Sequence, residues 1–175
     1  WAINAFGTSS PSAASASFSP TGRALFMGSS VGAGGVTDTD YISIESTGNA
    51  SDFGNLSAGS YGVSAISSST RALGFSVGGT TDVIEYFTVA STGNSTDFGN
   101  MAAAAQHQGS VSNSTRAIVA GGEESSVTNR IQYVTFSTAG NTTDFGDLIG
   151  SGNTTYSPAP ANSTTRGVFA GGISS

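Results

Sequence analysis

Charged side chains recur in this sequence as an aspartate followed, about 20 residues later, by an arginine. A guanidinium and a carboxylate can form two parallel hydrogen bonds, so a repeated, partly buried pair would fix the geometry between units. The alternative chemistry is a ring of guanidinium groups that binds an anion in a central channel. We favour the structural pair, because packing demands recurrence in every unit, and expect Asp97→Ala to lower the melting temperature. The aspartates are Asp52, Asp97 and Asp144, and the arginines are Arg71, Arg116 and Arg166.

Other groups that could do chemistry carry no motif. His107 is the one histidine and could act as a general base, but no serine or cysteine nucleophile is tied to it, so we expect a structural histidine. The acidic residues near the glycine pairs lack the alternation of a calcium loop. We interpret them as solvated charges, and Asp40, Glu85 and Gln132, which precede a tyrosine in each repeat, as including sheet surface. The sequence predicts no enzyme, no metal and no cofactor.

The amino-acid composition excludes several kinds of binding partner and site. Only 9% of the 175 residues are charged and the formal net charge is −6, whereas about 25% charged residues is typical of soluble domains. The composition argues against nucleic acid as a partner, because phosphate binding needs a basic patch. No apolar run reaches the roughly 18 residues of a membrane helix, so we predict no membrane insertion. The absence of cysteine excludes disulfides and thiolate metal sites.

An internal repeat positions the charged residues. In three copies a tyrosine and a phenylalanine stand 12 residues apart, and a Thr-Arg block that ends in Gly-Gly follows each copy. A period of about 45 to 50 residues indicates propeller blades or a solenoid. We predict one repeat domain over 1–175, with units at approximately 1–30, 31–79, 80–122 and 123–175. The tyrosines are Tyr41, Tyr86 and Tyr133, and the phenylalanines are Phe53, Phe98 and Phe145.

Each copy predicts β-strands. Apolar residues alternate with Ser or Thr after the tyrosine, which is the pattern of a half-buried strand. A Gly-Asn pair then favours a turn, and Asp-Phe-Gly opens an outer strand. The Thr-Arg block predicts a further strand of small apolar residues. The run 101–105 has helix propensity, but its place in the repeat favours strand or loop.

These features together resemble the kelch repeat: a strand that closes on Gly-Gly, a variable hairpin, a tyrosine strand, and an aromatic about a dozen residues later. The resemblance implies an all-β, kelch-like β-propeller of about four four-stranded repeats of roughly 47 residues. Two features depart from that family: phenylalanine stands where tryptophan is commoner, and the Thr-Arg arginine is not a standard kelch residue. The copper site of galactose-oxidase-like members is excluded, because the chain lacks cysteine. Short low-complexity motifs of the sequence are also similar to repeats in large structural proteins of T4-like marine cyanophages.

A strand count indicates an assembly. Four arginine strands and four Phe-Gly elements accompany only three tyrosine strands, so the last blade would lack one strand. Either the chain is an excerpt of a longer array or a neighbouring chain supplies the strand, since an open edge invites pairing. We predict a non-enzymatic structural or adhesive protein of a virion, such as a tail fibre or another surface appendage, or of an extracellular assembly. Its partners would be other copies of itself or neighbouring subunits. The alternative is a lectin-like module that binds carbohydrate or protein, including a cell-surface glycan.

Segments that break the constant spacing are the predicted ligand loops, at 29–40, 123–130 and 151–165. Tyr61, Tyr156 and Asn153 could stack on a sugar or hydrogen-bond to it. Several asparagines stand in glycosylation sequons, but Asn, Ser and Thr also serve turns, and the turn interpretation is favoured. The candidate acceptors are Asn49, Asn94, Asn113, Asn141 and Asn162.

Overall fold

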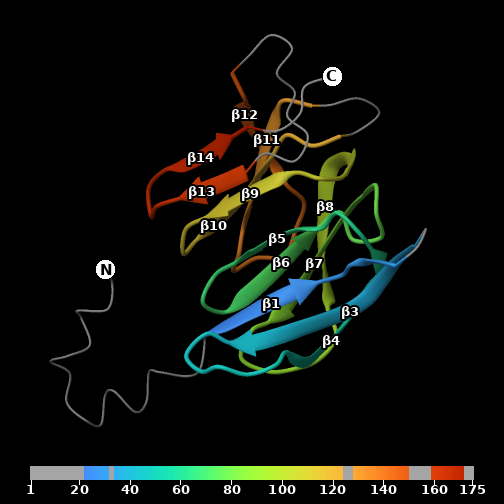
Figure 1. The fold of residues 1–175 in the computed structure, drawn as a ribbon. Coiled ribbons are helices and arrows are strands. Elements are labelled where there is room, and N and C mark those ends of the chain that lie inside the picture. The colour runs from blue at the N-terminus through green and yellow to red at the C-terminus, as the bar shows by residue number, and fades with distance from the viewer. Residues whose placement is uncertain (1–21, 32–33, 124–127, 150–158, 172–175) are drawn as a thin grey trace, which may run out of the picture.

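The computed structural model describes residues 22–31, 34–123, 128–149 and 159–171. These residues form fourteen β-strands and no helix (Figure 1). The strands are β1 (Arg23–Met27), β2 (Ser30–Val31), β3 (Gly34–Ser43), β4 (Ser51–Ser60), β5 (Ser64–Ser67), β6 (Arg71–Phe75), β7 (Thr81–Thr88), β8 (Thr96–Ala105), β9 (Gly109–Ser112), β10 (Arg116–Ala120), β11 (Arg130–Thr135), β12 (Thr143–Asp147), β13 (Ala159–Asn162) and β14 (Gly167–Ala170).

The second sheet shows how one repeat folds. Its strands pair antiparallel in the order β5-β6-β7-β8. The arginine strand β6 lies inside the sheet, where its small and apolar residues after Arg71 are buried. The tyrosine strand β7 follows, and β8, which carries Asp-Phe-Gly, forms the edge, as predicted. The third sheet repeats this order with β9-β10-β11-β12.

In the first sheet, as in the other two, the tyrosine strand lies between the arginine strand and the outer strand. Strand β3 lies between β1 and β4, and its N-terminal end also pairs with β2. Our expectation of a variable loop over 29–40 is therefore wrong for 30–31 and 34–40, which lie in strands, while 32–33 fall outside the described residues. Gly35 pairs with Ser30, and Val36 pairs with Ser60, so ladder pairing holds the described part of this segment in extended strands.

A bulge recurs at one place in all three sheets. The register between the tyrosine strand and the outer strand shifts just after a residue that faces the glycine of Asp-Phe-Gly. Each of these glycines has a positive φ, which side chains rarely tolerate. The Asp-Phe-Gly pattern is thus explained locally as a bulge signal. The angles are 147° at Gly54, 145° at Gly99 and 135° at Gly146.

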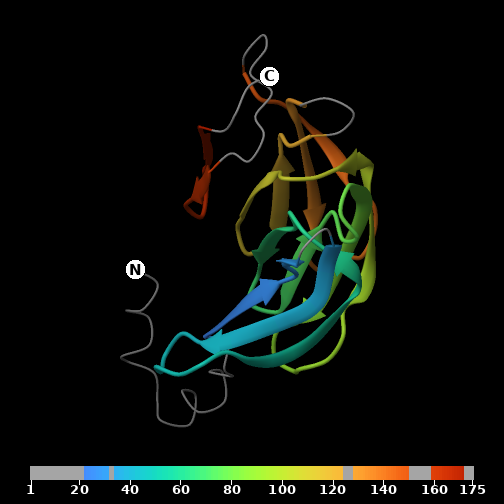
Figure 2. The same cartoon turned by 45° about the vertical axis from the view of Figure 1, so that its right-hand side comes forward.

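The core lies between successive sheets. The first and second sheets pack around Phe53, Leu56, Val77 and Phe87, and the second and third sheets around a larger cluster that includes Phe98 and Phe136. Figure 2 shows the three sheets following one another in chain order. The segment 101–105 lies in β8, with Met101 and Ala105 buried, which confirms strand over helix there because burial decides against local propensity.

The prediction of an all-β chain built from four-stranded antiparallel sheets is confirmed. No sheet closes on itself among the described residues, and the last described unit is the hairpin β13-β14. Each sheet draws its strands from two successive sequence units: β5 and β6 precede residue 80, whereas β7 and β8 follow it. No described segment forms a helix with the length and apolarity needed to cross a membrane.

Candidate functional site

The repeated arginines lie over the repeated tyrosines. The distance from the guanidinium carbon to the ring centroid is 4.8 Å for Arg23 and Tyr41, 4.5 Å for Arg71 and Tyr86, and 4.6 Å for Arg116 and Tyr133. Each tyrosine also meets the phenylalanine of its own sheet edge to face, with centroids 5.6 to 6.1 Å apart. Arg, Tyr and Phe therefore form one cluster per sheet, held by cation–π and aromatic contacts.

The expected arginine–aspartate pair is not formed. Within the described residues none of Asp52, Asp97 and Asp144 pairs with a Thr-Arg arginine, and all three aspartates are exposed. Neighbouring residues of a strand point to opposite faces of the sheet. Because Phe98 faces the arginine cluster, Asp97 must face away from it. The arginine–aspartate pair predicted from sequence spacing is wrong, because the guanidinium instead stacks on the tyrosine of the adjacent strand.

The same arginines link one sheet to the next. Arg23 Nη1 donates to the carbonyl oxygen of Val89 at 3.0 Å, and Arg71 Nη1 donates to that of Phe136 at 2.7 Å. Both acceptors stand three residues after the tyrosine of the following sheet. Each half-buried arginine is thus held by a ring in its own sheet and a carbonyl in the next.

The residue before the tyrosine makes a second link between sheets. Glu85 is 4% exposed and accepts hydrogen bonds from the Ser57 backbone N–H at 3.2 Å, from the Ser57 hydroxyl and from Ser95 Oγ at 2.5 Å. Gln132 takes the same place in the third sheet, where Ala102 N and Thr142 Oγ1 donate to it. The interpretation of Glu85 as solvated is therefore wrong. Its strand parity, shared with Phe87 and Val89, is the signal that would have placed it at the interface.

The Gly-Asn turn makes the third link. Gly93 N donates to Phe53 O and Gly140 N to Phe98 O, both at 2.7 Å. The side-chain oxygens of Asn94 and Asn141 accept from Asn55 N at 3.1 Å and from Asn100 N at 3.0 Å. These turns pack closely against the bulge glycines. A Cβ on Gly54 would collide with the carbonyl of Gly93, and a Cβ on Gly99 would collide with that of Gly140.

The other predicted site residues lie apart from these links. Asn113 accepts from the backbone of Thr115 and Arg116, and Asn162 Nδ2 donates to Ser112 O at 2.6 Å. His107 has a φ of 57° and its ring lies against Gly62. Tyr61 is 40% exposed, and its ring covers Gly79. Asn49 is exposed, whereas Asn153, Tyr156 and most of 151–165 lie outside the described residues.

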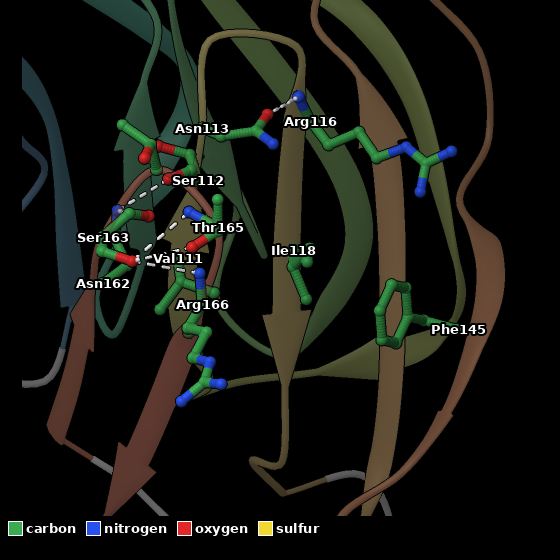
Figure 3. A pocket seen from close by; sticks show the side chains of 12 residues that line it. Val111, Ser112, Asn113, Arg116, Ile118, Phe145, Asn162, Ser163, Thr165 and Arg166 are labelled. Atoms are coloured by element: carbon green, nitrogen blue, oxygen red, sulfur yellow. Dashed lines mark hydrogen bonds between the residues drawn. The ribbon is translucent and has the colours of Figure 1, made fainter.

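A groove lies between the third sheet and the hairpin β13-β14. Its apolar part, of about 680 Å³, is lined by Ile118, Ile131, Phe145 and Phe169 among others. An adjoining pocket of about 220 Å³ is lined by Arg116 and Arg166 among others. Figure 3 shows these two arginines on opposite walls, with Phe145 on the side of Arg116 and Asn162 on the side of Arg166.

The described residues offer no cluster of three or more His, Asp or Glu that could hold a metal ion. The chain matches no known family model and resembles no curated protein closely enough to identify a relative. The side chains that recur are therefore understood from their geometry alone: they join one sheet to the next.

Proposed function

We propose that the chain is a non-enzymatic structural module, a kelch-like propeller scaffold in an extracellular assembly such as a virion appendage. One observation carries this proposal: the recurrent Arg, Tyr, Phe, Glu or Gln, and Gly-Asn residues are all used in contacts within or between sheets. A catalytic or ligand site would instead need a few convergent groups that repetition does not explain.

The propeller arrangement is supported by a row of first strands. Ser110 and Ser112 of β9 donate to the carbonyls of Ala65 and Ser67 of β5, both at 3.1 Å. On its other side, Ser112 O accepts from Asn162 of β13. Strand β9 thus contacts β5 on one side and β13 on the other, which is the expected placement of first strands around a propeller axis.

The structural role has a direct test in the native mass of the protein from its natural source. The chain has a mass of 17.3 kDa, and we expect it to sediment within a particle several times heavier that dissociates on denaturation. A free monomer of 17 kDa in its native setting would contradict the role in an assembly.

A sugar-binding module is the second candidate, and Tyr61, which is 40% exposed, favours it. Exposed aromatic rings offer an apolar face for a sugar and a hydroxyl for hydrogen bonding. Saturable binding to a glycan array that is lost in Tyr61→Ala, with the fold intact by circular dichroism, would select this function over the structural one.

A further inference from the structure

The third sheet exposes a face that its predecessors bury. Phe53 and Phe98 are each 2% exposed under the tyrosine strand of the next sheet, whereas Phe145, at the same repeat position, is 53% exposed. Among the described residues, no carbonyl accepts from the Arg116 guanidinium, and nothing lies within 4 Å of a Cβ built on Gly146. The arginine–carbonyl link and the Gly-Asn turn link of the two earlier interfaces are therefore both open here within the described chain.

The hairpin beside this face is also incomplete. Within the described chain β14 pairs only with β13, whereas the corresponding strands β6 and β10 pair on both edges. Arg166 precedes β14 as Arg71 begins β6, yet no tyrosine ring of the described residues covers its guanidinium. The apolar groove of about 680 Å³ lies along this free edge.

We propose that this groove is a docking site for one extended segment with the pattern Tyr, apolar, Ser or Thr, apolar, three further residues, then Gly-Asn. The segment would add to β14 as an antiparallel strand, which is recognition by β-augmentation. The proposal deepens the structural role proposed above by naming the chemistry of the partner.

The earlier sheets specify the register of the docked strand. Leu73 pairs with Tyr86 and Ala72 with Phe87, so the incoming tyrosine lies opposite Val168 and the following apolar residue opposite Gly167. The tyrosine ring then covers the Arg166 guanidinium. The apolar residue packs on Phe145, as Phe87 packs on Phe53 with ring centroids 5.5 Å apart.

The remaining links follow from the same correspondence. The carbonyl three residues after the tyrosine accepts from Arg116, as Phe136 O accepts from Arg71. The N–H of the glycine in the Gly-Asn pair donates to Phe145 O, and the carbonyl of the same glycine packs against Gly146. The asparagine accepts from Asp147 N, as Asn141 accepts from Asn100 N.

The described chain has no spare strand of this kind. Strands β3, β7 and β11 are each paired on both edges. The two other tyrosines of the sequence, Tyr61 and Tyr156, are followed by glycine and serine instead of the apolar pattern. The occupant therefore comes from outside these 175 residues, and continuity with two existing interfaces defines its chemistry.

The test is binding of a peptide in trans to the full 175-residue chain. A fluorescein-labelled peptide with the sequence of residues 80–97, which contains the Tyr86 pattern, is titrated and its anisotropy measured. We expect saturable one-to-one binding and a rise in the melting temperature of the chain. We expect Phe145→Ser to weaken binding at least tenfold. Phe26→Ser is the matched control, because Phe26 is 55% exposed outside the groove, and should leave affinity unchanged.

Two further arms test the register. Arg166→Ala should weaken the native peptide but leave a peptide with Tyr86→Ala unaffected, since both changes remove one stack. A peptide of reversed sequence should not bind. Absence of saturable binding, equal binding of the reversed peptide, or equal loss in Phe26→Ser would each overturn the proposal. Peptide binding fails or succeeds independently of the native particle mass, so failure of this inference is distinguishable from failure of the structural role.

Discussion

The second and third sheets carry nearly the same residues but present different faces. Thr-Asp-Phe-Gly opens the outer strand of both, yet Phe98 is buried and Phe145 is exposed. The difference comes from the tyrosine strand of the following sheet, which covers Phe98 and has no counterpart over Phe145 in the described chain. Burial of this residue is thus supplied by the neighbouring unit, as in other repeat proteins whose stability is a sum of nearest-neighbour interfaces.

The comparison predicts its largest effect at the phenylalanine itself. Phe98→Ala would leave a cavity between the second and third sheets and should lower the free energy of unfolding by about 3–5 kcal/mol. Phe145→Ala removes chiefly its edge-to-face contact with Tyr133 and should cost about 1 kcal/mol. Urea denaturation followed by tyrosine fluorescence measures both. Equal losses would mean that the two faces are equally covered.

The buried Glu85 sharpens the comparison between the two closed interfaces. Glu85→Ala leaves the Ser57 N–H and the Ser57 hydroxyl without their acceptor, which should cost about 1–3 kcal/mol. Glu85→Gln should cost less than half of that, because Gln132 performs the same role between the second and third sheets. The urea midpoints of the two variants decide this. A Gln variant as unstable as the Ala variant would show that the negative charge itself is needed.

Substitution of the arginines distinguishes a sheet that is bonded to the next sheet from one that is not. Arg71→Ala removes a tyrosine stack and a hydrogen bond to Phe136 O, whereas Arg116→Ala removes only a stack. We expect Arg71→Ala to cost about 1 kcal/mol more, the net value of a typical hydrogen bond. The comparison is made by urea denaturation at one salt concentration. An excess cost for Arg116→Ala would contradict the assignment of the open face.

The strands were predictable because their signals are local. Alternation after Tyr86, the Gly-Asn turns and the bulge glycines all lie within a dozen residues of one another, so the sequence suffices for the all-β assignment and for the outer position of Asp-Phe-Gly. The interfaces were not predictable in the same way. Arg71 and Phe136 O are 65 residues apart, and their contact depends on how two sheets stack.

Strand parity is the feature of the sequence that identifies Glu85 as a buried residue. Glu85 and Phe87 share one face of β7, and Tyr86 lies on the other. Before the tyrosine both faces of the strand are covered, since Ile84 and Glu85 are both buried, whereas after it the predicted alternation holds, with Thr88 exposed between two buried residues. A polar residue in parity with buried apolar neighbours is expected to be buried and hydrogen-bonded.

The smallest effect is expected where spacing suggested a large one. Asp97 was expected to pair with an arginine, but it is exposed and within the described residues makes no ion pair with Arg71 or Arg116. Asp97→Ala should therefore change the free energy of unfolding by no more than about 0.5 kcal/mol. Its neighbour Phe98 is the internal control: one residue along the same strand should matter about tenfold more, because it alone faces the next sheet. A large loss in Asp97→Ala by urea denaturation would restore the arginine–carboxylate pair and remove the tyrosine as the principal partner of the guanidinium.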